Sequence, residues 1–559
     1  MILSALVNRY EEASAVPLGW QKREASYTID LSHEGELLGI STLGDANAKK
    51  PEKLPMILPT IGKGRSGKKA YETAYFLCDN ADFMLGLDPK KFESARKLHI
   101  ALLENVDSLN ARAIKAYFAC GIPALLPGDA DKIDTKFNYV FSVNGKRVDY
   151  DDGGVEIRQA WDAVAQVKAD NEDEIRCLVT GKTDSVIKLH YKVGLRSVTM
   201  GAQPFIAMNN QTSFRSYGAG TSDPPADIGQ YAAFAYATAL NGLLKDERHC
   251  QYSGDDAMVF WAEKGGEAEE SLFADIFAPA KADEDSELAD IMARIAKGDK
   301  PTAIDMERKF YLLCLSPNAA RISIRFFHTC AFGDLICNIG SHYNRLSIVH
   351  DGRTPFNFLP TWLILSETTI KKSAKDAHPL LSGQLLYSVI TGGNYPFTLY
   401  HAILTRIRAG EDINKTKAAV IKAVLIKNFK EEEVTTMALN ELSTNKPYIL
   451  GRLFSVLERL QERANGTATI RERYFSSACA NPRLVFPTLL NLSMHHAAKL
   501  DNAVFYEKLK GTLLERLDDD VPFPPTFGLE EQGKFILGYY HQTQAFFTKK
   551  TDGEVTKDE

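Results

Sequence analysis

The sequence predicts an α+β fold, in which a mixed α/β amino-terminal region with antiparallel strands and hairpins precedes a carboxyl-terminal all-α helical bundle. Two patterns lead to this prediction. Short runs of β-branched and aromatic residues flank turn sequences in the first half, and apolar residues recur at helical spacing from about His378 onward. We therefore expect a mixed region over residues 1–377 and a helical bundle over residues 378–559.

Hairpins and helices alternate in the amino-terminal region. Residues 27–31 and 36–42 flank a Ser-His-Glu-Gly turn, which indicates a hairpin. Residues 138–143 and 146–149 flank Asn144-Gly145, the dipeptide favoured in a type I′ turn. The other expected elements are helices at 92–105, 110–118 and 233–244, and strands at 184–193, 258–263 and 320–327.

The later part of the chain reads as surface helix and then as packed helix. Residues 265–300 are rich in Glu, Asp and Ala, so we expect a flexible, acidic excursion there. Asn481 and Pro482 read as the cap and first residue of a helix. Three apolar stripes predict bundle helices: Leu450, Leu453, Phe454, Leu457 and Leu460; Phe486, Leu489, Leu490, Ala497 and Leu500; and Phe535, Gly538, Tyr539 and Phe546.

Composition narrows the classes of protein. A hydrophobic content of 45% and a charged content of 25% over 559 residues are ordinary for globular proteins. No apolar run reaches membrane-spanning length and the first ten residues lack signal-peptide features, so we expect a cytoplasmic protein with no membrane contact. The eight cysteines include no pair with zinc-ribbon or redox spacing, so neither a metal nor a cofactor is expected.

A short basic segment, Gly62–Lys69, is the most informative part of the sequence. Its glycines let the backbone approach a phosphate closely, and its cations supply the charge that a polyphosphate attracts. We interpret it as a nucleic-acid-binding loop on an acidic protein, whose net charge of −6 argues against indiscriminate binding. The residues expected to contact nucleic acid here are Lys63, Gly64, Arg65, Lys68 and Lys69.

The same segment has three other interpretations, two of which are nucleotide-binding motifs. Its glycines spell G-x-G-x-x-G, but the two prolines in residues 53–59 argue against the buried strand that a dinucleotide fold requires. It also fits G-x-x-x-x-G-K, yet Lys69 stands where magnesium binding needs Ser or Thr. A solvated loop without function is the third reading.

A polar segment at residues 209–218 is the second candidate. Side-chain amides can hydrogen-bond base edges in pairs, aromatic rings can stack or wedge at a base step, and Arg can bind a phosphate. An Asn/Ser-rich turn that satisfies its own backbone is the alternative. The residues expected to face nucleic acid are Asn209, Asn210, Gln211, Thr212, Ser213, Phe214 and Arg215.

Hydrolytic chemistry has one weak candidate. His350-Asp351 is an H-D dipeptide of the kind found in metal-dependent phosphohydrolases, which need further ligands that converge in space. No G-x-S-x-G nucleophile elbow surrounds Ser213 or Ser216. An NTPase or HD-type nuclease built on Gly62–Lys69 or on His350-Asp351 is therefore the alternative function.

Several segments, in this order, resemble one family, the large subunit of the type I-C CRISPR effector complex (Cascade), also called the Csd-type CRISPR-associated family. The resemblance spans essentially the whole chain apart from residues 265–300. The matching segments are Met1–Val7 with Gly19-Trp20, Phe76–Ala81, Leu85–Asp88, Phe214 with Ser216–Gly218, Ala232–Asn241, Leu315–Arg321, Phe332-Gly333, Gly383–Leu386, Leu450–Phe454 and Asn481–Arg483.

The resemblance implies a non-catalytic subunit of a crRNA-guided antiviral DNA surveillance complex. Such a subunit recognises the protospacer-adjacent motif (PAM) in duplex DNA, assists strand opening, stabilises the R-loop and helps to recruit a helicase–nuclease. Its implied partners are crRNA, target double-stranded DNA, the displaced non-target strand, the Cascade backbone subunits, a handle-binding subunit and small helical subunits. Similar proteins encode the small subunit through an internal start, which Met437 could provide here, so that residues 437–559 resemble it.

Overall fold

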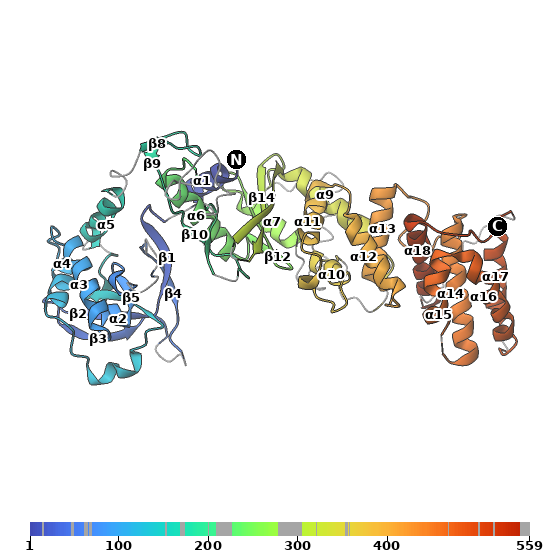
Figure 1. Ribbon diagram of the computed structural model, residues 1–559, viewed down its shortest axis with the longest axis horizontal. Coiled ribbons are helices and arrows are strands. Elements are labelled where there is room, and N and C mark those ends of the chain that lie inside the picture. Colours follow the sequence, from blue (N-terminus) through green and yellow to red (C-terminus); the bar gives the residue numbers. More distant parts are fainter. Residues whose placement is uncertain are drawn as a thin grey trace, which may run out of the picture. The chain divides into compact units, whose positions relative to one another are not determined.

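The computed structural model describes residues 1–547 except 14–15, 46–49, 61–64, 66–69, 151–153, 168–173, 199–200, 208–225, 278–303, 320, 351, 353–355, 357, 468, 501–502 and 518–519. The chain forms two compact units (Figure 1). The first comprises Met1–Val193 with Gln203–Gly242, and the second comprises Gly194–Ala202 with Leu243–Glu559.

A mixed sheet organises the first unit. Its strands run in the order β3 (Leu37–Thr42), β2 (Tyr27–Leu31), β6 (Asn138–Val143) and β5 (Cys78–Asn80), and β7 (Lys146–Arg147) also pairs with β6. β2 and β6 are parallel, whereas the other pairings are antiparallel. The predicted hairpins at 27–42 and 138–149 are therefore confirmed, because β2 pairs with β3 and β6 pairs with β7.

Helices cover this sheet and close its core. α3 (Pro89–Leu102) and α4 (Leu109–Ala119) match the two predicted helices to within a few residues. Asp88 caps α3 and Ser108 caps α4, each by accepting hydrogen bonds from first-turn N–H groups. Phe92, Phe118 and Phe141 then join helices and sheet in one aromatic core, with Phe92 and Phe118 ring centroids 5.4 Å apart.

Other elements of the first unit lie outside that sheet. β1 (Trp20–Ala25) and β4 (Leu54–Pro59) form a separate antiparallel ribbon in which Trp20 opposes Pro59. The remaining elements are α1 (Ile2–Ala13), η1 (Ala70–Glu72), α2 (Ala81–Met84), η2 (Pro127–Lys132), α5 (Val155–Val167), β8 (Glu174–Arg176), β9 (Thr183–Ser185), β10 (Lys192–Val193), β11 (Gln203–Pro204) and α6 (Gln230–Lys245).

The predicted strand at 184–193 is wrong in extent. Only its ends are strand, because β9 pairs with β8 and β10 pairs with β11. Between them Val186 makes an isolated bridge to Gly229. Two different partners therefore divide a run whose β-branched residues suggested one strand.

An antiparallel sheet begins the second unit, in the order β12 (Cys250–Ser253), β13 (Asp256–Ala262), β14 (Lys309–Asn318) and β15 (Arg321–Ala331). α7 (Glu267–Phe277) and α9 (Phe332–Leu346) contribute to the core on one face of it. Phe260 and Phe273 are central, with ring centroids 4.5 Å apart.

The first part of the expected surface excursion is thus packed helix. Phe273, Ile276 and Phe277 form an apolar stripe on α7 that outweighs its acidic composition. Glu269 and Glu270 are also buried, because they accept hydrogen bonds from the N–H groups of Asp305 and Ala262. Residues 278–300 of the expected excursion lie outside the described residues.

Helices follow to the end of the described chain, which confirms the predicted α+β class. They are α10 (Thr361–Ser366), η5 (Ala374–Asp376), α11 (Leu381–Thr391), α12 (Phe397–Arg408), α13 (Lys415–Val424), η6 (Leu425–Phe429, a π-helix), α14 (Lys446–Asn465), α15 (Ile470–Ala480), α16 (Pro482–Ala497), α17 (Val504–Glu515) and α18 (Leu529–Phe547). The sheet and these helices share one core, so the expected boundary at 377/378 does not coincide with the division into units.

α14 and α18 cross at very short range within the terminal bundle. A Cβ added at Gly451 would lie 1.9 Å from the Phe535 carbonyl oxygen, and one added at Gly538 would lie 2.1 Å from that of Tyr448. The glycines therefore let the two backbones approach each other. Tyr448 also contacts His541 across this crossing, with 2.9 Å between the hydroxyl oxygen and Nδ1.

We expect Gly451→Ala to lower the free energy of unfolding by about 1–3 kcal/mol, because the methyl group overpacks a backbone contact. Chemical denaturation of the full chain measures this. Gly511→Ala in α17 is the matched control, because no atom lies within 4 Å of the added Cβ. The control should stabilise slightly through helix propensity. Equal stability of the two variants would contradict the close crossing.

Candidate nucleic-acid interface

Within the Gly62–Lys69 segment, the structure describes Arg65 alone. Its guanidinium carbon lies 3.9 Å from the ring centroid of Tyr75 and 3.7 Å from that of Phe83. Its Nε donates to the Thr73 carbonyl oxygen at 2.7 Å. The side chain is therefore clamped between two rings and hydrogen-bonded to the following turn.

A buried carboxylate completes the clamp. Arg65 forms an ion pair with Asp79, whose side chain is 1% exposed. Asp79 also accepts hydrogen bonds from the N–H groups of Tyr75, at 2.9 Å, and Asn80, at 2.8 Å. Burial raises the pKa of the Asp79 carboxyl, and the hydrogen bond from Arg65 opposes that rise. Asp79 lies on β5, so the ion pair fastens the basic segment to the main sheet.

Two further arginines lie around the same strand. The Arg23 guanidinium, on β1, is 5.3 Å from the Tyr75 ring centroid, and its Nη1 is buried with no hydrogen-bond partner among the described residues. Arg147 donates to Asp149 at 2.5 Å and to the Ile57 carbonyl oxygen at 3.1 Å. Burial raises the pKa of the Cys78 thiol to about 11 although both arginines favour its thiolate.

The structure describes one of the residues predicted to bind nucleic acid, Arg65. The sequence predicts that Arg65 contacts a phosphate; in the structure its guanidinium is paired with Asp79 and hydrogen-bonded to the Thr73 carbonyl oxygen, and its contact with nucleic acid stays a prediction. Lys63, Gly64, Lys68 and Lys69 lie outside the described residues, as do Asn209, Asn210, Gln211, Thr212, Ser213, Phe214 and Arg215. Their contacts with nucleic acid stay predictions.

Sequence reasoning missed Arg23, Arg147 and the anchoring carboxylate Asp79. Trp20–Ala25 carries four consecutive polar residues between Trp20 and Ala25, so no alternation of polar and apolar residues marked Arg23, and its half-buried position follows from the pairing of β1 with β4. No local pattern pairs Arg65 with Asp79, which only the turn between them brings together.

The NTPase alternative uses the same Gly62–Lys69 segment, whereas the residues of the HD-type nuclease alternative are separate from this cluster in sequence. His350 is exposed and its Nδ1 accepts a hydrogen bond from the Gly352 N–H at 2.8 Å, while Asp351 lies outside the described residues. Within the described part of the chain, no group of three or more His, Cys, Asp or Glu side chains could hold a metal ion. Nor is any helix there both long and apolar enough to span a membrane.

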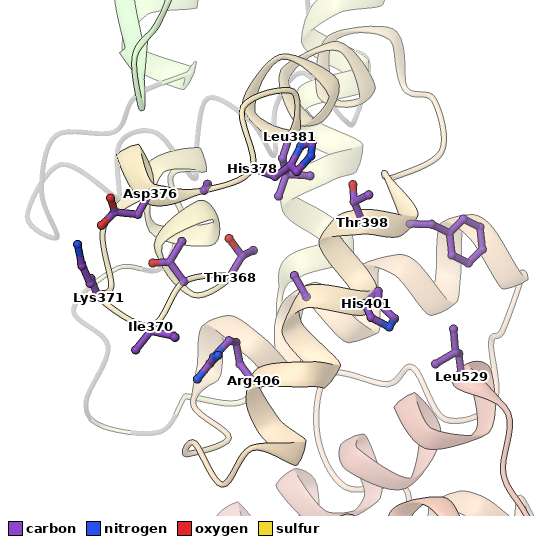
Figure 2. A pocket seen from close by; sticks show the side chains of 14 residues that line it. Thr368, Ile370, Lys371, Asp376, His378, Leu381, Thr398, His401, Arg406 and Leu529 are labelled. Carbon is purple, nitrogen blue, oxygen red and sulfur yellow. The ribbon is translucent and has the colours of Figure 1, made fainter.

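A cavity of about 830 Å³ opens in the second unit (Figure 2). Ile370 and Lys371, which follow α10, lie on one side, and His401 and Arg406 of α12 lie on another. Its lining is mainly apolar, and Phe397 and Leu529 complete it. None of the residues predicted from sequence to bind nucleic acid lines this cavity.

Breaking the anchor should destabilise the fold. Arg65→Met leaves a buried, unpaired carboxylate, so we expect the free energy of unfolding to fall by about 3 kcal/mol at pH 8. The loss of the cation raises the pKa of Asp79 further, and a carboxyl with a higher pKa in the folded state takes up a proton on folding. The variant should therefore regain stability as the pH falls toward that pKa.

Two further variants make this measurement specific. Arg65→Met with Asp79→Asn removes both charges and should recover much of the stability without the pH dependence. Arg96→Met removes an exposed ion pair with Glu93 and should change stability little. If denaturant titrations showed Arg65→Met and Arg96→Met to be equally stable, the anchoring role would be excluded.

Comparison with known proteins gives the family. The sequence matches the family Cas_Csd1, described as CRISPR-associated protein, over residues 4–547. A search among curated proteins finds no significant match. The family match covers both units, including the anchor Arg65–Asp79 and the terminal bundle. The chain therefore belongs to the Cas_Csd1 family of CRISPR-associated proteins, in agreement with the resemblance of its sequence to Csd-type Cascade large subunits.

Proposed function

We propose that this protein is the non-catalytic large subunit of a type I-C crRNA-guided complex, and that it recognises the PAM in duplex DNA. The anchoring of Arg65 carries the proposal. Lys63, Lys68 and Lys69 are at most four residues from Arg65, so the chain can place them no more than roughly 14 Å from a fixed point. The glycines let the segment follow a phosphate backbone, while Arg65 stays fixed to the main sheet.

The division of labour between guide and protein suits such a local site. Base pairing with crRNA discriminates target sequence, so the protein needs to read only a short motif and to hold backbones. A cationic segment on a chain with a net charge of −6 supplies a local contact without general affinity for nucleic acid. We propose that residues 209–212 read the PAM, because the amides of Asn209, Asn210 and Gln211 can pair with base edges.

The competing enzymatic function receives less support. In a phosphate loop the backbone between the two glycines wraps the nucleotide, whereas Arg65 in that interval is hydrogen-bonded to Thr73 and paired with Asp79. Purified chain with Mg²⁺ or Mn²⁺, nucleotide and labelled DNA distinguishes the two functions. Turnover that Lys68→Ala or His350→Ala abolishes would favour the NTPase or HD-type nuclease.

The proposal includes a set of partners and a location. In a complex of this kind the protein would contact crRNA, target DNA, the displaced strand, the backbone and handle-binding subunits, small helical subunits and a recruited helicase–nuclease. It would assist strand opening and R-loop stabilisation in the cytoplasm.

We further propose that Met437 serves as an internal start. Met437 is 62% exposed and lies before α14, so a chain that begins there would contain α14 to α18, including the Gly451–Gly538 crossing. Mass spectrometry of complexes made from the single gene should find a product that begins at Met437. Met437→Leu with otherwise intact coding sequence should remove it, and its absence from wild-type complexes would refute the idea.

The lysine contacts have a distinct salt signature. Replacing Lys63, Lys68 and Lys69 together by Ala should weaken DNA binding on all sequences and reduce the slope of log affinity against log salt by about 2.7 for duplex DNA. Fluorescence anisotropy over a range of salt concentrations measures this, and thermal unfolding should be unchanged. An unchanged slope would show that these lysines do not contact phosphates.

Substitutions in residues 209–212 should behave differently. Replacing Asn209, Asn210, Gln211 and Thr212 by Ala should alter which PAM sequences are accepted, because base-edge contacts are lost. The salt slope should change little, since no cation is removed. A library depletion assay measures PAM preference, and an intact preference would move PAM recognition to other residues.

A further inference from the structure

A cluster of cations lies in the second unit where α9 ends and α13 continues into the π-helix η6. Arg345 is in the last turn of α9, Lys422 is on α13, Lys427 is in η6, and Lys430 follows it. Arg345 and Lys427 are half-buried and Lys430 is exposed.

Tyr395 holds this cluster together. The Arg345 Nε donates to the Tyr395 hydroxyl oxygen at 3.2 Å, and the guanidinium carbon is 5.5 Å from the ring centroid. The side-chain amide of Asn428 accepts from the Tyr395 N–H at 3.0 Å and donates to its carbonyl oxygen at 2.8 Å. Asn428 directly follows Lys427, so Tyr395 positions both Arg345 and the π-helix.

Backbone carbonyls fix two of the lysines. Lys422 Nζ donates to the Ser347 carbonyl oxygen at 2.6 Å, so it caps the carboxyl end of α9. Lys430, whose φ is 61°, donates through Nζ to the Lys427 carbonyl oxygen at 2.6 Å. Lys422 is buried, so its task is structural, whereas Arg345, Lys427 and Lys430 remain accessible to a ligand.

The cluster carries uncompensated positive charge. Among the described residues, no ion pair joins Arg345, Lys422, Lys427 or Lys430 to a carboxylate. Burial lowers the pKa of Lys427, and Arg345 and Lys430 lower it further, so the three cations lie within electrostatic reach of one another. Burial alone lowers the pKa of Lys422 to about 8.

The acidic residues that follow Lys430 in sequence, Glu431 to Glu433, mostly have other partners. Glu431 pairs with Lys534 at 2.5 Å, and Glu433 accepts hydrogen bonds from Ser443, at 2.8 Å, and from the Thr444 N–H, at 2.9 Å. Glu432 is exposed and is the remaining carboxylate of that run.

Elsewhere in the same unit, the buried Lys417 and the exposed Lys372 both have carboxylate partners. Lys417 contacts Glu367 at 3.1 Å and Glu411 at 3.0 Å, and Lys372 contacts Glu367 at 2.9 Å. Those lysines have carboxylate partners, whereas Arg345, Lys427 and Lys430 have none among the described residues. The repulsion between these three cations is therefore not offset by a carboxylate. π-Helical turns are often retained at functional positions; η6 carries Lys427, and Lys430 is the residue that caps its carboxyl end.

We propose that Arg345, Lys427 and Lys430 form a binding site for the phosphodiester backbone of a nucleic acid, additional to the Gly62–Lys69 segment. The proposal rests on the proposed function only in taking nucleic acid as the ligand. Guanidinium and ammonium groups are the donors that phosphates prefer. Tyr395 is 4% exposed, so its ring offers no stacking surface to a base and the contact does not depend on base identity.

The test uses the full-length chain and two labelled DNAs of mixed sequence, a 40-nucleotide single strand and the matching duplex. The variant carries Arg345→Gln, Lys427→Gln and Lys430→Gln. Anisotropy titrations over a range of salt should show the slope of log affinity against log salt reduced by about 2 for the single strand or about 2.7 for the duplex. A change of that size on one DNA, with the slope on the other DNA left at the value of the control, identifies the form of backbone that the site takes.

A matched control and a milder variant keep the result interpretable. Lys371→Gln, Arg473→Gln and Lys508→Gln remove three exposed cations of the same unit, none of which forms an ion pair among the described residues. Their slope change should be clearly smaller. Lys427→Gln with Lys430→Gln leaves the Arg345–Tyr395 contact intact and should lower the single-strand slope by about 1.4 while preserving thermal stability.

The outcomes separate this site from the proposed function. If replacing Lys63, Lys68 and Lys69 has no effect while the Arg345 variant loses affinity, the loop assignment fails and this site stands. The converse result overturns this site alone. A slope equal to that of the control, or a loss of binding to an acidic protein subunit without loss of DNA binding, would also overturn it.

Discussion

The ion pair between Arg65 and Asp79 is the contact on which the candidate interface of the first unit depends. Asp79 is buried on a strand of the main sheet, and charge in such a place is stable only when partners surround it. Arg65, the Tyr75 N–H and the Asn80 N–H supply those partners, and the rings of Tyr75 and Phe83 cover the guanidinium. A buried carboxylate without a partner is unfavourable, so the ion pair of Asp79 with Arg65 keeps the basic segment attached to the sheet.

The protein treats its cations in two ways, and the difference has functional meaning. Arg65, Arg147 and Lys417 neutralise buried carboxylates, so their charge is consumed by the fold. Arg345 donates to the Tyr395 hydroxyl oxygen, and Lys430 donates to the carbonyl oxygen of Lys427. These partners are uncharged, so they leave the positive charge of the cluster in place. Charge that survives folding is available to an anionic ligand, which the composition of the chain could not distinguish from charge that is consumed.

Local patterns predicted the regular elements well where one rule dominated. Tyr27–Leu31 alternates in burial as expected of a half-buried strand, and Asn481 and Pro482 begin α16 as cap and first residue. The same rules failed where tertiary partners intervened. Residues 184–193 divide between two pairings, and the acidic α7 is buried because its Phe stripe packs against β13 and its glutamates find backbone donors.

The sequence alone determined the α+β class, the helical carboxyl-terminal region and the resemblance that the family match bears out, because these follow from periodicities and motifs within a few residues. The tertiary structure decided that Arg65 is paired with Asp79, that Gly451 and Gly538 permit a backbone crossing, and that Arg345 lies within electrostatic reach of Lys427. These facts depend on which distant residues meet. A side chain's charge or size acquires its role only from the partner that folding brings within contact distance.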